Sequence, residues 1–500
     1  MEKLPPFMGW STWNQFHQHI SEDIIMDVAR AMKANGLLDA GYRYINLDDC
    51  WQASVRDEAG RLAFDTGRFP GKEGIVGKLN ALGFKMGIYS SCGTLTCEDM
   101  PGSYGFEQLD ANTFAAWGVE YLKYDYCHVM DINTDPHFSH QGFADKTPPI
   151  LNIAVANLNG KPGETVFPAA DAVLTPPAVR EGDGIVGLDC PRASATFQVH
   201  AVEDGTYPLA VTYEKTKPHP HKRFLLVSVN GLPDVQVWFP PTSGWHSPAR
   251  VTAFLQLKAG ENKITLTNPI RSQREDSIMR YTQMGEALKK AAPPGKPIYY
   301  AICEHGRTAP WTWAADIASS WRISGDISAR WEGVMKCYET IADLWKYQQP
   351  GTYNDPDMLE VGIGNLTETE NRSHFILWCM LSAPLVLGLD VRTINEKTLK
   401  LITNPDYIAI NQDEKLLQAS RTRLTDTVDV LIKPLSGERF ALCVFNKGDA
   451  STDKMELQYK DMATYDPRLD LQTEAILQIP AIAPRDVFLS VMENTFSSHI

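Results

Sequence analysis

The sequence predicts an α/β protein: a (β/α)8 TIM barrel that is interrupted by an inserted all-β sandwich and followed by a C-terminal antiparallel β domain. Short apolar runs alternate with helix-length amphipathic stretches in residues 1–131 and again in 278–413. Residues 132–277 and 414–500 instead show the period-2 alternation and the turn residues of antiparallel sheets. We therefore expect domain boundaries at these positions.

Four strands are expected in the first half of the barrel, at about 6–10, 44–47, 85–89 and 121–124. Between the first two, Ile24, Val28 and Met32 recur every four residues, and Gly36 follows as a stop signal. This spacing predicts an amphipathic helix.

Four further strands are expected after the insert, at 298–301, 320–323, 351–354 and 384–387. Helices are expected at 281–292, 333–346 and 368–381, and Thr367 and Glu370 have the spacing of a capping box for the last of them. Four strands on each side of the insert give the eight of a barrel.

Both β modules carry specific signals. In the insert, Asn230-Gly231 predicts a tight hairpin turn between 224–229 and 235–239. In the C-terminal module, the alternation of apolar residues at 428–432 and 440–444 predicts two antiparallel strands.

Composition limits the partners. The net charge of −14 gives no electrostatic reason to bind nucleic acid or an anionic membrane, and no run approaches the length of a membrane span. The first residues lack a secretory signal, so the chain as written is expected to be cytoplasmic, or secreted or periplasmic if a signal was removed. The oligomeric state stays open, with a homo-oligomer as one alternative.

Acidic residues follow several of the predicted barrel strands. They are Asp48, Asp49, Asp125, Asp326, Asp355 and Asp357. Catalytic residues of TIM barrels lie at the carboxyl ends of the strands, so these acids are expected to converge on one face. Carboxylates accept hydrogen bonds from sugar hydroxyls, and aromatic side chains pack on the apolar face of a sugar. We expect a ring of aromatic side chains around the site, formed by Trp10, Trp51, Tyr89 and Trp321.

Metal binding is the competing use of such a cluster. The histidine pairs His17/His19 and His219/His221 are distant in sequence from the acid-bearing strand ends, and the nine cysteines are scattered without a C-x-x-C pair. We therefore expect neither a metal site nor a cofactor.

Two pairs of opposite charge stand near predicted strand ends. Lys123 and Asp125 lie two residues apart on one strand, so both side chains are expected to point into the barrel mouth, where the lysine would keep the carboxylate ionised. Arg322 and Asp326 form the second pair. A structural ion pair is the alternative for each.

With these residues the chain resembles glycoside hydrolase family 27, the α-galactosidase and α-N-acetylgalactosaminidase family. The similarity covers about 1–131, 278–405 and the C-terminal sandwich, and it rests on seven ordered motifs: Met8-Gly9-Trp10, Leu47-Asp48-Asp49-Cys50-Trp51, Gly87-Ile88-Tyr89-Ser90, Tyr121-Leu122-Lys123-Tyr124-Asp125-Tyr126-Cys127, Cys303-Glu304, Trp321-Arg322-Ile323-Ser324-Gly325-Asp326-Ile327 and Asn354-Asp355-Pro356-Asp357-Met358.

The resemblance implies a retaining, exo-acting α-galactosidase that releases terminal α-linked galactose from oligosaccharides or glycans. Asp125 would be the nucleophile and Asp326 the general acid/base, with their carboxyl groups about 5 to 5.5 Å apart. Asp48 would bind the 6-hydroxyl and Asp49 the 4-hydroxyl.

Further positions match substrate contacts of the family. Tyr89, Lys123 and Arg322 would contact the sugar, Trp10 would line the pocket, and Cys303-Glu304 would face its 2-substituent. An acid such as Glu304 favours galactose over N-acetylgalactosamine. Cys97 and Cys127 match a family disulfide.

Two departures from the family stand out. His305 follows Glu304 where many relatives have tryptophan, and the insert resembles a β-sandwich carbohydrate-binding module. The alternatives are a family enzyme acting on another sugar (an α-N-acetylgalactosaminidase or a β-L-arabinopyranosidase) and a non-catalytic, lectin-like galactose-binding protein.

Overall fold

The computed structural model describes residues 4–70, 74–129, 149–188, 193–214, 223–231, 235–240, 247–267, 273–469 and 476–493. His219 and His221 lie outside these residues. The chain forms two compact units, one of residues 1–128 with 280–500 and the other of residues 129–279.

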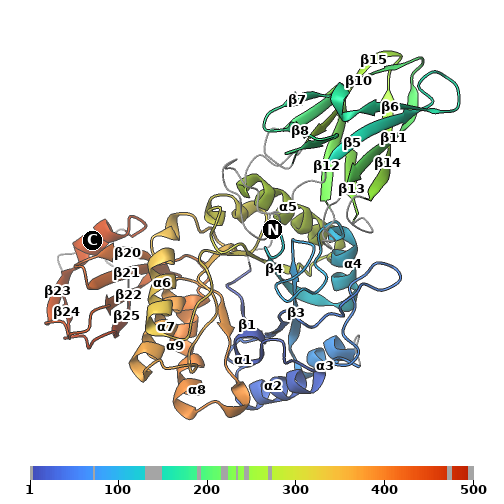
Figure 1. Ribbon diagram of the computed structural model, residues 1–500. Coiled ribbons are helices and arrows are strands. Elements are labelled where there is room, and N and C mark those ends of the chain that lie inside the picture. Colours follow the sequence, from blue (N-terminus) through green and yellow to red (C-terminus); the bar gives the residue numbers. More distant parts are fainter. Residues whose placement is uncertain are drawn as a thin grey trace. The chain divides into compact units, whose positions relative to one another are not determined.

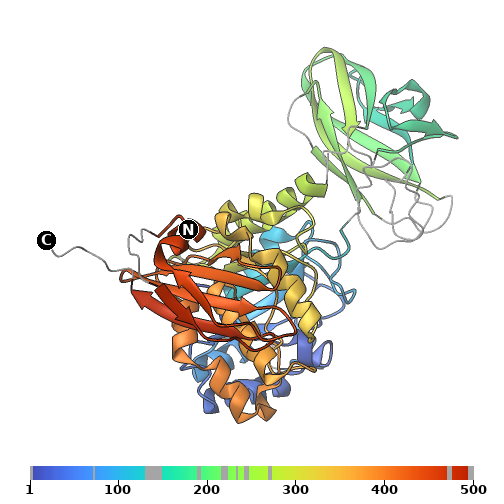
Figure 2. The same ribbon diagram turned by 90° about the vertical axis from the view of Figure 1, so that its left-hand side faces the viewer.

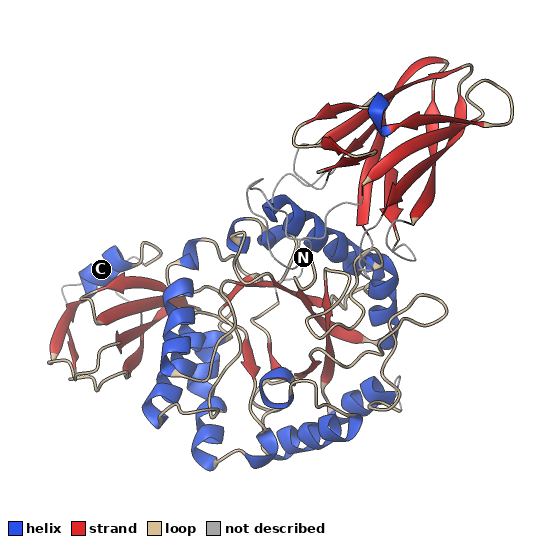
Figure 3. Ribbon diagram, viewed as in Figure 1, coloured by secondary structure: helices blue, strands red, loops and turns tan. Residues whose placement is uncertain are grey.

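Eight parallel strands form the centre of the first unit, encircled by helices (Figure 3). In spatial order they are β18 (Tyr353–Asp355), β17 (Ser320–Arg322), β16 (Tyr299–Cys303), β4 (Val119–Asp125), β3 (Lys85–Ser91), β2 (Tyr44–Leu47), β1 (Met8–Ser11) and β19 (Leu385–Leu387). A parallel bridge from Leu359, just after β18, to Leu387 of β19 joins the two edges. The predicted eight parallel strands are confirmed, and their ends differ from the predicted ones by no more than two residues.

Helices surround these strands. They are α1 (Trp13–Phe16), α2 (Glu22–Ala34), α3 (Gly74–Leu82), α4 (Glu107–Trp117), α5 (Gln273–Ala291), α6 (Trp331–Ile341), α7 (Glu368–Met380), α8 (Glu396–Ile402) and α9 (Pro405–Asn411). Val28 and Met32 of α2 are fully buried, as their spacing predicts. The capping box of Thr367 and Glu370 is present at the start of α7. The helix expected at 333–346 ends at Ile341, and a short 3-10 turn follows.

The second unit is a β-sandwich (Figure 1). One sheet has the order β13-β12-β15-β10-β7 and the other β14-β11-β5-β9-β8, with β6 paired to β5. Their bounds are β5 (Ile150–Ala156), β6 (Glu164–Pro168), β7 (Val173–Thr175), β8 (Val179–Glu181), β9 (Gly184–Val186), β10 (Ser194–Ala201), β11 (Gly205–Glu214), β12 (Arg223–Val229), β13 (Val235–Phe239), β14 (Pro248–Leu257) and β15 (Gly260–Thr267).

One apolar core lies between these two sheets, with buried residues such as Leu209 from one sheet and Phe197 from the other. Asn230 and Gly231 both have positive φ at the end of β12, and β12 pairs antiparallel with β13, as the hairpin signal predicts.

The C-terminal module packs on the barrel helices within the first unit (Figure 2). Its main sheet has the order β20 (Ser420–Arg423), β21 (Val428–Leu435), β22 (Arg439–Asn446) and β25 (Val487–Glu493), and β23 (Met455–Gln458) pairs with β24 (Ile476–Ile479); α10 is Tyr459–Tyr465. Tyr338 of α6 donates a hydrogen bond to Asp429 of β21, and Lys433 of β21 donates to the carbonyl oxygen of Cys379 in α7. β21 is therefore buried on both faces.

Among the described residues, none of the helices combines the length and the apolar character needed to cross a membrane.

Candidate active site

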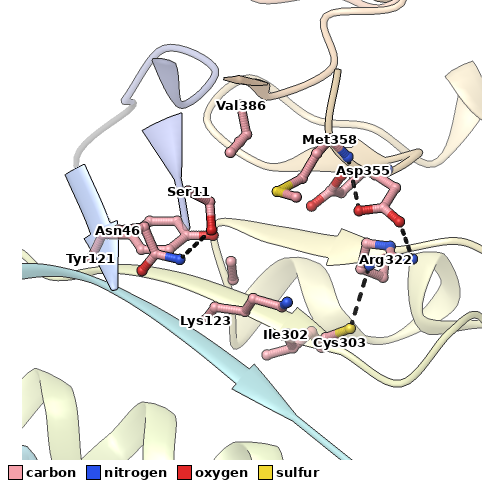
Figure 4. A pocket seen from close by; sticks show the side chains of 12 residues that line it. Ser11, Asn46, Tyr121, Lys123, Ile302, Cys303, Arg322, Asp355, Met358 and Val386 are labelled. Carbon is pink, nitrogen blue, oxygen red and sulfur yellow. Dashed lines mark hydrogen bonds and ion pairs between the residues drawn. The ribbon is translucent and has the colours of Figure 1, made fainter. Parts of the chain in front are cut away.

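A pocket lined by both charged and apolar side chains lies at the carboxyl ends of the barrel strands (Figure 4). Its lining residues come from seven strands and the segments that follow them: Ser11, Asn46, Tyr121, Lys123, Ala301, Ile302, Cys303, Arg322, Asp355, Asp357, Met358 and Val386. Tyr121 and Lys123 of β4 both face it, since residues two apart on a strand share a face.

Asp125 ends β4 and is nearly buried, with 7% of its surface exposed. The Tyr89 hydroxyl donates to its Oδ2 over 3.2 Å, and the backbone N–H of Tyr126 donates to its Oδ1 over 2.8 Å. Two donors on two different oxygens fix the plane of the carboxylate, which is the requirement for an oriented nucleophile.

Lys123 does not pair with Asp125, which corrects the sequence-based expectation. Its Nζ lies 2.9 Å from Oδ2 of Asp48, which follows β2, two strands away from β4 in the sheet. Burial alone would lower the pKa of Lys123, but Asp48, Cys303 and Asp125 together outweigh it and raise that pKa, so the ammonium group stays charged.

Asp49 is held mainly by backbone groups. Its carboxylate accepts from the N–H of Cys50 over 2.7 Å and from the N–H of Glu98 over 3.0 Å. Burial raises the pKa of Asp49 to about 6, even though hydrogen bonds from Thr96 and Glu98 oppose that shift. The two adjacent acids thus differ: Asp48 faces a cation, and Asp49 does not.

Arg322 joins the acids on the opposite side of the pocket. One of its terminal nitrogens lies 3.0 Å from Asp326 and 2.7 Å from Asp357. The pair expected between Arg322 and Asp326 is therefore present, but Asp357 is the closer partner. Burial raises the pKa of Asp326, yet neighbouring groups, with the positive charge of Arg322 first among them, leave that pKa below its ordinary value. Asp326 is also the exposed acid of the group, with 73% of its side chain accessible.

The loop after β16 contributes three consecutive residues. Cys303 is buried, lines the pocket and accepts a weak contact from Arg322. Glu304 is 1% exposed, and its carboxylate accepts hydrogen bonds from the backbone N–H and the hydroxyl group of Thr308. His305 is partly exposed, with its Nε2 3.4 Å from Oδ1 of Asp326. Glu304, which we expected to face the 2-substituent, is thus turned into its own loop.

The tryptophans do not form the expected aromatic ring around the pocket. Trp10, Trp51 and Trp321 are fully buried, and each donates its indole N–H inside the protein, to Leu389, Tyr89 and Asn354 respectively. Trp10 precedes the pocket-lining Ser11 on β1, so alternation points it at the helix layer. The assignment of Trp10 to the pocket lining is therefore wrong.

Trp13 is the better placed indole. It starts α1 directly after β1, is half-buried, and packs against the cluster that contains the pocket residue Met358.

Seven pocket-lining residues were not among those predicted for the site: Ser11, Asn46, Tyr121, Ala301, Ile302, Met358 and Val386. Asp355 and Asp357 also line the pocket; they were predicted among the acids at the strand ends but were given no role. The sequence held a signal for Asn46, because it stands on β2 two residues before Asp48, which follows that strand. Burial raises the pKa of Asp355 to about 6 despite the opposing charge of Arg322.

Cys97 and Cys127 form the expected disulfide, and Cys127 lies two residues after the end of β4. The Tyr89 hydroxyl oxygen is 3.5 Å from the sulfur of Cys97 and also donates to Asp125. The bond therefore buttresses the tyrosine that orients Asp125.

Two groups of side chains bring metal-ligand atoms within 4.8 Å of one another: Cys97, Asp125 and Cys127, and Asp125, Cys303 and His305. In the first, the disulfide removes both thiolates. In the second, burial raises the pKa of the Cys303 thiol well above its ordinary value, which disfavours the thiolate that binds metals. Neither group is a good metal site.

Comparison with known proteins gives consistent matches. The family model described as "Alpha galactosidase A" matches residues 5–146 and 263–413. "Alpha-galactosidase 2" of Arabidopsis thaliana is 31% identical over 453 residues, covering 90% of this chain and 77% of that protein. "Alpha-galactosidase A" of Cellvibrio japonicus is 28% identical, with 90% and 77% covered. The crystal structure of α-galactosidase I from Mortierella vinacea superposes with a TM-score of 0.65 at 24% identity, covering 98% and 97%, and shows the fold.

Proposed function

We propose a double displacement on Asp125 and Asp326 as the mechanism of this chain, which belongs to the α-galactosidase A family and is an α-galactosidase. The observation that carries the assignment of roles is the contrast between the two acids. Asp125 is buried and held by two hydrogen bonds, as suits a nucleophile, whereas Asp326 is exposed at the mouth, where a leaving group would depart.

In the first step Asp125 attacks the anomeric carbon while Asp326 donates its proton to the glycosidic oxygen, and the aglycone leaves. In the second step water, deprotonated by Asp326, displaces Asp125 and releases galactose with retained configuration. Arg322 stabilises the Asp326 carboxylate that the first step produces. A bound substrate would exclude water, and the resulting loss of solvation would raise the pKa of Asp326 toward that of an acid catalyst.

The sugar contacts follow from the charges of the pocket. Asp48 and Asp49 would accept from the 6- and 4-hydroxyl groups, and Lys123 and Arg322 would donate to sugar oxygens. We propose Trp13 as the flat apolar partner of the ring, because it is half-buried and packs against the cluster that includes Met358.

Cys303 would lie beneath the 2-hydroxyl. Glu304 would reach it only if its hydrogen bonds to Thr308 opened. This constraint leaves a family enzyme with another sugar preference as the alternative.

For the remaining regions we propose the boundaries 132–277 for a carbohydrate-binding-module-like insert and 414–500 for the C-terminal sandwich. A two-sheet architecture with a single core supports the comparison of the insert to such modules. The substrate class is a galactose-terminated oligosaccharide or glycan.

The test is hydrolysis of four 4-nitrophenyl glycosides: α-galactoside, α-N-acetylgalactosaminide, β-L-arabinopyranoside and α-glucoside. We expect the α-galactoside to dominate and its release to vanish in Asp125→Ala. Preference for another sugar would overturn the assignment of Asp48, Asp49 and Glu304. Galactose binding without turnover on any glycoside would favour the lectin-like alternative.

A further inference from the structure

His305 lies between the two proposed catalytic acids. Its Nε2 is 3.4 Å from Oδ1 of Asp326, and one of its ring nitrogens lies within 4.8 Å of a carboxylate oxygen of Asp125. About a quarter of its side chain is exposed.

The backbone holds His305 firmly in this place. His305 has φ 60°, a left-handed conformation that costs a non-glycine residue about 1 to 3 kcal/mol and persists only where the surrounding structure imposes it. Gly306 follows, and a Cβ on this glycine would lie 2.2 Å from the carbonyl oxygen of Ile323, next to Arg322. The turn is therefore packed directly against the segment that carries Arg322 and Asp326.

We propose that His305 is a positioning residue for Asp326, which holds the carboxyl group of this acid over the glycosidic oxygen during proton transfer. The proposal rests on the proposed function, because it assumes that Asp326 is the acid/base. The contact of 3.4 Å is long for a hydrogen bond, and contacts of this kind shorten when substrate fills a site.

The chemistry of a neutral imidazole suits this task. It carries one donor and one acceptor nitrogen, so it can donate to the Asp326 carboxylate or accept from the protonated acid, depending on which nitrogen holds the proton. Arg322 cannot accept a hydrogen bond from the protonated acid, because a guanidinium group has donors and no acceptor.

The charged groups that face His305 are Arg322, Arg307, Asp125 and Asp326. Burial and then the charge of Arg322 lower the pKa of His305, although both aspartates oppose this shift. The imidazole is therefore neutral near neutral pH, as the proposed role requires.

The test uses the leaving group. A nitrophenolate departs with little help from an acid, whereas methanol departs only when protonated. We expect His305→Gln to lower kcat/KM for methyl α-galactoside about tenfold and to change kcat/KM for 4-nitrophenyl α-galactoside less than threefold, because kcat/KM reports the first step, in which Asp326 acts as an acid. His200→Gln is the matched control, since His200 also pairs with an acid, Glu261, but in the other unit; it should leave both rates unchanged.

A double-mutant cycle separates positioning from a structural role. In an Asp326→Ala background, adding His305→Gln should change neither substrate's rate, because the acid on which it acts is absent. Equal losses on both substrates, no loss on either, or a further loss in the Asp326→Ala background would overturn the role of His305. If His305→Gln does not fold, His305→Asn enters the same cycle with the same expectations.

If the proposed function is wrong and Asp326 is not the acid/base, Asp326→Ala should hydrolyse methyl α-galactoside as fast as the wild type. A selective loss in Asp326→Ala together with an unaffected His305→Gln would instead refute the role of His305 alone.

Discussion

Replacing Lys123 by methionine tests whether one buried ion pair supports both the fold and the sugar site. Lys123 and Asp48 lie 2.9 Å apart, with 20% and 3% of their side chains exposed. Lys123→Met leaves the Asp48 carboxylate buried without its cation, and breaking such a pair costs about 3 to 5 kcal/mol. The barrel with its C-terminal sandwich comprises about 350 residues, whose unfolding entropy is about 0.7 kcal/mol/K. The expected fall in Tm is therefore about 4 to 7 °C.

The double variant Lys123→Met/Asp48→Asn sharpens this prediction. It removes both charges, and the amide can still contact the hydroxyl group of Ser11, which lies 3.4 Å from Asp48 in the wild type. Calorimetry should show that the double variant regains most of the decrease in Tm. Hydrolysis of 4-nitrophenyl α-galactoside should stay impaired, because the site has lost both a donor and an acceptor for the sugar. A single variant as stable as the wild type, or a double variant no more stable than the single one, would refute the reasoning.

Three other predictions concern pH and metals. Burial raises the pKa of Asp49 to about 6, so this acid is mostly protonated below pH 6. Galactose affinity, measured by calorimetry, should therefore be weaker at pH 5 than at pH 7. If Asp49→Asn left the affinity unchanged at both pH values, the role of Asp49 would be contradicted. Burial lowers the pKa of Lys433 to about 7, below its unfolded value. Between about pH 7 and 10 the unfolded chain therefore binds one proton more than the folded chain. As the pH rises through this range, the wild type should gain about 1.4 kcal/mol of stability per pH unit relative to Lys433→Met. Urea unfolding at pH 7 and 9 measures this gain, and a constant difference would show that the amine is charged when folded. Chelators should leave turnover unchanged, and their full inhibition would refute a metal-free mechanism.

The barrel could be predicted because its signals are local. Each strand is a short apolar run, and an acid that follows such a run must lie at the carboxyl end of the sheet, where all parallel strands of a barrel present their loops. Asp355 lines the pocket, Asp48 pairs with the pocket-lining Lys123, and Asp125 ends the strand that carries this lysine; their position at one end of the barrel follows from this topology rather than from any contact visible in the sequence.

Partner choice could not be predicted in the same way. Lys123 has Asp125 as its sequence neighbour, yet it pairs with Asp48, which is 75 positions away. The choice depends on the register of β2, β3 and β4, and period-2 spacing carries no information about register between strands. The prediction that Trp10 lines the pocket was wrong for a related reason. All four residues of β1 are buried, so no alternation of apolar and polar residues shows which face of the strand is inside the barrel.

In the loop after β16, the family motif and the structure assign different residues to the site. The Cys303-Glu304 match assigns the acid to the sugar, but beyond the end of a strand the backbone dihedrals, not alternation, decide which side chain reaches the mouth. Here a left-handed His305 and a glycine packed on Ile323 turn the chain so that Glu304 is 1% exposed and bound to Thr308, while His305 contacts Asp326. A loop of this shape changes which of two consecutive side chains contacts the acid, without moving the strand that precedes them. Proton transfer by Asp326 should therefore be more sensitive to substitution at His305 than at Glu304, although the motif alone assigns a role in the site to Glu304 and none to His305.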